Sequence, residues 1–75
     1  MRTTDIVKEL MGKKEMKPSV MARRLGISNQ AMNDRLKHLK GVNNFSACLT
    51  QLDYKVVAVP INTRIKDDWY EVTEE

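Results

Sequence analysis

The stretch MARRLGISNQAMNDRLK, residues 21–37, is the most informative part of the sequence because it joins two helix-forming segments through a single glycine. Gly26 interrupts the stretch, and Ser28 follows after one apolar residue, Ile27. Glycine adopts the left-handed conformation that ends a helix at little cost, and serine is a favoured cap for the start of the next helix. Two short helices joined by such a turn cross at a steep angle. The stretch therefore predicts a helix-turn-helix.

Small and apolar residues surround the predicted turn. Ala22 allows the two backbones to approach closely, and Ile27 fills the angle between the helices. The second helix, expected over residues 28–38, carries one apolar face formed by Met32, Leu36 and Leu39. In units of this kind, the second helix presents its N-terminal residues to the major groove of DNA.

The first turns of this second helix carry amide side chains in place of charges. Asn29, Gln30 and Asn33 lie along one side of it, away from the apolar face. An Asn or Gln side chain offers a donor and an acceptor side by side, which match N6 and N7 of adenine. Such amides therefore favour the reading of base edges over general phosphate binding. The alternative is that these side chains only fill an exposed first turn.

Basic residues flank the predicted reading helix. Residues 1–40 hold ten Lys or Arg and four Asp or Glu, whereas residues 41–75 hold three and six. This asymmetry indicates that the first part faces a polyanion, although a basic solvated surface without a target is the alternative. The expected phosphate contacts on these flanks are Arg23, Arg24, Lys37 and Lys40. Arg35 could equally pair with an acid of the fold.

The pattern predicts four helices in all, of which the second of the helix-turn-helix is described above. One is expected over about residues 4–14, one from Pro18 to Gly26, and one from an Asn43 or Asn44 cap to Leu52.

The chain changes character after these helices. YKVVAVPI, residues 54–61, is rich in β-branched residues and predicts a strand, and WYEV, residues 69–72, predicts a short return strand. The expected fold class is therefore α+β in one domain, residues 1–75. A small helical body with the helix-turn-helix, residues 1–53, precedes a C-terminal β-hairpin, residues 54–73.

A two-stranded hairpin is marginally stable alone, and its outer edge offers unpaired backbone groups. The expected contacts of a homodimer are therefore Val57, Val59 and Trp69 on this hairpin. The alternative is that the hairpin packs on its own helices and that Trp69 fills the core of the monomer.

The segment VMARRLGISNQAMNDRLK resembles the Cro and lambda-repressor-like helix-turn-helix family, also called XRE-type regulators. The match rests on Met21-Ala22, on Leu25-Gly26-Ile27-Ser28, on Gln30 and on Met32, and FSACLTQLDYKVVAVP is similar to small phage and bacterial members. The resemblance implies a dimeric DNA-binding regulator whose base-reading residues are Ser28, Asn29, Gln30 and Asn33.

Three positions depart from the family's pattern. Lys17-Pro18 stand where the family often has Thr-Gln, whose glutamine binds a phosphate, and Lys17 could replace that contact through its charge. Lys14-Glu15 occupy a bend where a glycine often precedes the second helix. Asp53 stands where a glycine usually precedes the tyrosine of the strand, so strain is expected at that helix end.

No catalytic constellation stands out, and an enzyme, a metal site, a cofactor and a small-molecule ligand are not expected. One histidine and one cysteine cannot form a zinc site of the usual kind. The N-terminus lacks the apolar run of a signal peptide, and no stretch is apolar enough to span a membrane. A cytoplasmic regulator of transcription, most simply a repressor, is therefore expected to bind double-stranded DNA. The rival hypothesis is a protein-binding module that docks a partner through its acidic C-terminal hairpin.

Overall fold

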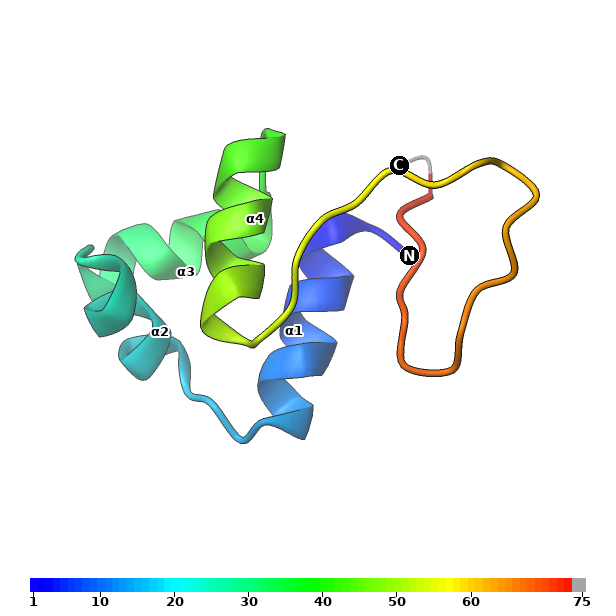
Figure 1. Cartoon of the computed structure of the whole chain (residues 1–75). Coiled ribbons are helices and arrows are strands. Elements are labelled where there is room, and N and C mark those ends of the chain that lie inside the picture. Colours follow the sequence, from blue (N-terminus) through cyan, green and yellow to red (C-terminus); the bar gives the residue numbers. More distant parts are fainter. Residues whose placement is uncertain (74–75) are drawn as a thin grey trace.

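The computed structural model describes residues 1–73, and this part of the chain contains four helices and no strand (Figure 1). The helices are α1 (Thr3–Lys13), α2 (Pro18–Leu25), α3 (Asn29–Lys37) and α4 (Val42–Gln51). The predicted α+β class is therefore wrong, because the described chain is a small helical body followed by an irregular segment. No helix among these residues has the length and apolar character required to cross a bilayer.

All four helices contribute to one core. Its buried apolar side chains lie between Ile6 and Leu52, so the helical body alone supplies them. The hydroxyl of Thr4, also buried, accepts a hydrogen bond from the backbone N–H of Leu39 at 3.2 Å. This bond satisfies a backbone donor in the link between α3 and α4 and ties that link to α1.

Three of the helices end in the same way, with a left-handed residue just beyond the last turn. These residues are Glu15 (φ 53°), Gly26 (φ 70°) and Asp53 (φ 64°). After α4, the N–H of Tyr54 bonds to the carbonyl of Leu49 at 2.9 Å, and the N–H of Asp53 bonds to that of Thr50 at 3.2 Å. This pair of bonds defines a Schellman cap, which the chain repeats after α1 and α2.

The starts of α2 and α3 agree with the sequence, and the start of α4 differs. Pro18 opens α2, and the Oγ of Ser28 accepts a hydrogen bond from the N–H of Ala31 at 3.1 Å, as expected of a cap. The predicted asparagine cap of α4 is wrong, because Gly41 holds that position. The amide of Asn44 instead donates to the carbonyl of Lys40 at 2.9 Å, one turn earlier.

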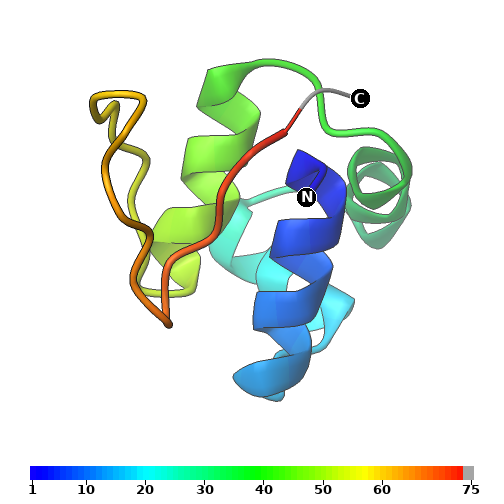
Figure 2. The same cartoon turned by 90° about the vertical axis from the view of Figure 1, so that its right-hand side faces the viewer.

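The predicted hairpin over residues 54–73 is absent. This stretch, called the C-terminal segment below, leaves α4, forms a wide loop and returns past the start of α1 (Figures 1 and 2). Its own backbone bonds are two local turns, from Thr63 to Pro60 and from Trp69 to Lys66. The returning part bonds to the first residue of the chain, since the N–H of Thr73 donates to the carbonyl of Met1 at 3.0 Å. The two legs therefore form no ladder.

Aromatic side chains fasten the returning leg to the helical body. The hydroxyl of Tyr54 donates to the carbonyl of Asp68 at 2.9 Å, and its ring meets that of Tyr70 edge-on at 6.0 Å between centroids. The Nζ of Lys13 on α1 donates to the hydroxyl of Tyr70 at 2.6 Å, and this bond raises the pKa of Lys13. The segment is thus held at its two ends, and the turn between them projects outward (Figure 1).

Candidate nucleic-acid interface

The pair α2 and α3 forms the corner that the sequence predicts. Gly26 turns the chain in the left-handed conformation, and a side chain there would meet no neighbouring atom within 4 Å, so the requirement for glycine lies in the backbone alone. Ala22 and Met32 are buried, and Ile27 packs against the core from the turn. The predicted glycine turn and serine cap are confirmed, and together they fix the direction of α3.

The amides at the head of α3 face solvent. Asn29, Gln30 and Asn33 are exposed, and their side chains have no hydrogen-bond partner in the described part of the chain. Ser28 is exposed as well, but its oxygen caps the helix, so its hydroxyl hydrogen is what remains for an external acceptor. Three unpaired amides on a rigid helix end are suited to hydrogen-bond recognition.

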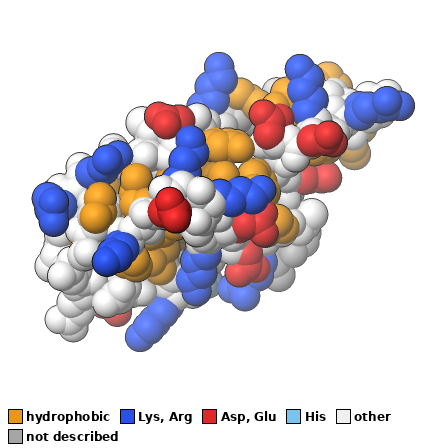
Figure 3. All heavy atoms as spheres, turned by 90° about the horizontal axis from the view of Figure 1, so that it is seen from below, with side chains coloured by type: hydrophobic (Ala, Val, Ile, Leu, Met, Phe, Trp, Pro, Cys, Tyr) orange, Lys and Arg blue, Asp and Glu red, His pale blue; other side chains and the backbone are white. Residues whose placement is uncertain are grey.

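The predicted phosphate-binding residues are also free. Lys17, Arg23, Arg24, Lys37 and Lys40 are all exposed. Within residues 1–73, the ion pairs are Lys13 with Glu9 at 3.9 Å and Lys14 with Asp53 at 3.5 Å. None of the five cations takes part in them. Figure 3 shows Lys and Arg side chains projecting from the helical part of the molecule on one of its faces.

The start of α2 adds one backbone donor to this basic surface. Lys17 precedes the helix and provides no side-chain cap, and Pro18 brings no N–H. The N–H of Ser19 has no partner in the described residues, so it points outward with the positive end of the helix dipole. Helix starts of this kind attract phosphate, and Lys17 adds its charge beside this one.

Arg35 and Cys48 are more buried than the predicted phosphate-binding residues. Arg35 is half-buried and forms no ion pair within the described residues. Its charge acts on Cys48 of α4, whose pKa is raised by burial and lowered, to a smaller extent, by Arg35. Cys48 is fully buried, as its place on the apolar face of α4 predicts. Among residues 1–73, no three His, Cys, Asp or Glu side chains form a metal-binding group.

The predicted dimer residues lie on the C-terminal segment and are exposed. Val57 is 61% exposed, Val59 43% and Trp69 39%, so Trp69 does not fill the core of the monomer. The Nζ of Lys66 lies 5.1 Å from the centre of the Trp69 ring.

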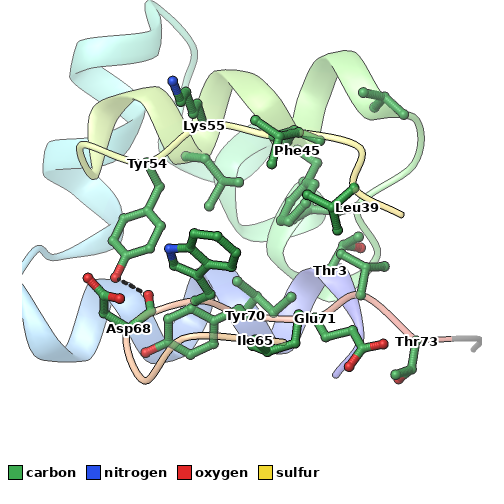
Figure 4. A pocket seen from close by; sticks show the side chains of 18 of the residues that line it. Thr3, Leu39, Phe45, Tyr54, Lys55, Ile65, Asp68, Tyr70, Glu71 and Thr73 are labelled. Carbon is green, nitrogen blue, oxygen red and sulfur yellow. Dashed lines mark hydrogen bonds between the residues drawn. The ribbon is translucent and has the colours of Figure 1, made fainter. Parts of the chain in front are cut away.

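A groove between the C-terminal segment and the helices was missed by the sequence reasoning. It is lined by residues of α1, α4 and both legs of the segment, among them Phe45, Tyr54, Ile65 and Tyr70 (Figure 4). The sequence gave one indication of this groove, because residues 54–73 contain seven apolar side chains that are exposed in the structure. The predicted hairpin would have packed these side chains, so the sequence did not predict a groove.

Comparison with known proteins found no family model, curated protein or solved structure that matches this chain.

Proposed function

We propose that this protein is a sequence-specific regulator that binds double-stranded DNA and inserts α3 into the major groove. The observation that carries the proposal is the set of exposed amides on Asn29, Gln30 and Asn33, held at the head of a helix whose direction Gly26 and Ser28 fix. A side chain that is free of internal partners and mounted on a rigid element can pair with a base edge without first breaking a bond.

The surrounding charges support the same target. Five cations form no ion pair within residues 1–73: Arg23 and Arg24 on α2, Lys37 on α3, Lys17 at the start of α2 and Lys40 on the link after α3. Cations of this kind bind the phosphate backbone and set the register of the protein on the duplex, while base contacts supply specificity. The resemblance to XRE-type regulators agrees with this division of roles. The regulator would act in the cytoplasm as a repressor that occupies its operator.

Selection of duplexes from a random pool, followed by titration of a selected duplex and a random one, tests the proposal. We expect Gln30→Ala and Asn33→Ala each to weaken binding to the selected duplex by about 1–3 kcal/mol, because each removes a pair of base contacts. Binding to random DNA should change little.

Asn62→Ala is the matched control, since Asn62 is an exposed amide in the projecting turn of the C-terminal segment. It should leave both titrations unchanged. Equal losses on selected and random DNA for Gln30→Ala and Asn33→Ala would show that α3 does not read sequence. Failure of the selection to enrich any duplex would remove the proposal altogether.

A further inference from the structure

The groove between the C-terminal segment and the helices gathers every aromatic residue of the chain. The sequence contains one Phe, one Trp and two Tyr, and all four line the groove: Phe45, Tyr54, Trp69 and Tyr70. They come from α4 and from both legs of the segment, so the tertiary structure brings them together (Figure 4). Sites for small organic molecules are typically lined by aromatic and apolar side chains with a few polar groups among them. The groove has this composition.

The size of the groove suits a bulky ligand that stays partly exposed. Its volume is about 1260 Å³, whereas pockets that enclose a small molecule usually measure about 300–1,000 Å³. Phe45 is buried, and Ile6 of α1 and Leu49 of α4 add buried apolar side chains to the lining. Trp69 belongs to the lining as well but remains 39% exposed. A ligand that covers Trp69 therefore removes apolar surface from water, which favours binding.

Two of the four rings already attract cations of the chain itself. The Nζ of Lys66 lies 5.1 Å from the centre of the Trp69 ring, and the Nζ of Lys13 lies 5.2 Å from that of Tyr70. A cation over an aromatic ring is attracted by the partial negative charge of the ring face. Neither lysine belongs to the lining of the groove, so neither ammonium group occupies it. The ring surface that lines the groove is therefore open to a further cation.

The ionisable side chains of the lining favour a cation over an anion. They are three acids and two bases: Asp53, Asp68, Glu71, Lys14 and Lys55. Lys14 and Asp53 pair with each other at 3.5 Å, whereas the other three form no ion pair within residues 1–73. Two acids and one base are left, so these three side chains carry a net charge of −1. The whole chain has a net charge of +3, so the attraction for a cation is local to the groove.

We infer that the groove binds an organic cation with a bulky apolar body, of the class of quaternary ammonium and phosphonium ions. The apolar body packs on the four aromatic rings, and the positive charge is balanced by the carboxylates of Asp68 and Glu71. Such an ion has no N–H to donate, so ring faces and carboxylates hold it without the directed hydrogen bonds that other ligands require. The site lies apart from α3 and does not rest on the proposed DNA contact.

The fluorescence of Trp69, the one tryptophan of the chain, tests this inference in the full chain without DNA. Tetraphenylphosphonium is the probe, and tetraphenylborate, which has the same shape and the opposite charge, is its control. We expect the phosphonium to change the emission of Trp69 at micromolar concentration, and the borate to bind about tenfold more weakly. Nonspecific adsorption to this basic chain would instead favour the borate. Equal binding of the two ions, tighter binding of the borate, or no response to the phosphonium would overturn the inference.

Substitutions of the ionisable side chains locate the bound charge. Asp68→Asn combined with Glu71→Gln should raise the dissociation constant of the phosphonium about five- to tenfold, because both free carboxylates are removed. Lys55→Gln should lower it about two- to threefold, because a like charge is removed. Asp67→Asn is the matched control, since Asp67 is exposed next to Asp68 but lies outside the lining.

These variants should keep the fold. All four side chains are exposed, and Asp68 and Glu71 hold the segment through their backbone carbonyls, which accept from the hydroxyl of Tyr54 and the amine of Met1. The circular dichroism of the helices should therefore be unchanged. If Asp67→Asn weakened binding as much as the double variant, or if Lys55→Gln weakened it too, the phosphonium would not bind as inferred.

Discussion

At the scale of single residues, the backbone conformation of Glu15 and Asp53 at the helix ends lowers the stability of the fold. Both residues are left-handed, a conformation that costs a non-glycine residue about 1–2 kcal/mol. Glu15 forms no ion pair in the described residues, so its replacement isolates the backbone term. Glu15→Gly should raise the free energy of unfolding by about 0.5–1 kcal/mol, once the greater freedom of glycine in the unfolded chain is deducted. Urea unfolding measures the change.

Gly26→Ala is the converse control. The added methyl group meets no neighbour within 4 Å, so only the left-handed backbone opposes it. We expect a loss of about 0.5–1 kcal/mol at this position. If Glu15→Gly and Gly26→Ala shifted stability in the same direction, backbone strain would not be the cause.

Cys48 gives a prediction for the dependence of stability on pH. Burial raises the pKa of its thiol, so the folded chain keeps this proton at a pH where the unfolded chain releases it. The contribution is fully present below the pKa of the unfolded thiol and is lost as the pH rises through the higher folded pKa. The free energy of unfolding should therefore fall more steeply above the ordinary thiol pKa in the wild type than in Cys48→Ala. Parallel curves across the alkaline range would contradict this account.

At the scale of elements, α2 and α3 both carry exposed cations that we propose contact the phosphates of DNA. Arg23 on α2 and Lys37 on α3 are exposed and unpaired in the described chain. If each contacts a phosphate, Arg23→Ala and Lys37→Ala should weaken binding to selected and random duplexes alike. Each should also reduce the salt slope of the binding constant by about one unit. Titrations over a series of salt concentrations measure the slope.

Arg64→Ala provides the comparison for these titrations, because Arg64 is exposed and belongs to the C-terminal segment, whose wide loop lies away from α2 and α3 (Figure 1). On a half-site duplex that binds one protein chain, the binding constant of Arg64→Ala should depend on salt concentration as that of the wild type does. An unchanged slope for Arg23→Ala and Lys37→Ala would place these cations off the phosphate backbone.

At the scale of the whole molecule, the helical body holds the buried core, and the C-terminal segment lies at its margin. The buried apolar core lies between Ile6 and Leu52, and the segment adds the partly buried Tyr54 and Tyr70 at its margin. A chain that ends at Asp53 should therefore keep its helices with a lowered melting temperature, and it should be monomeric and lose tight operator binding. Circular dichroism and light scattering measure the two effects. A truncated chain that still dimerises would assign the dimer contact to the helices.

The helical body and the corner between α2 and α3 could be predicted from local sequence patterns. Pro18, Gly26 and Ser28 act through their own backbone and side-chain preferences, and apolar residues at helical spacing marked the buried faces, so local rules sufficed. Glu15 and Asp53 stand where the family that the sequence resembles often has a glycine, so the sequence also indicated strain at these two helix ends. Both residues have the left-handed backbone conformation that glycine adopts more easily.

The course of the C-terminal segment depends on contacts between residues that are far apart in the sequence. Its β-branched run has the propensity of a strand, but a strand exists only where a partner satisfies its backbone. Thr73 bonds to Met1, and Tyr70 bonds to Lys13, so the returning leg lies against α1 and leaves residues 55–59 unpaired. These contacts join residues at opposite ends of the chain, and no local pattern encodes them. The propensity of residues 55–59 therefore indicates that they can form a strand. The contacts between the two ends of the chain leave them without a strand partner in the single chain.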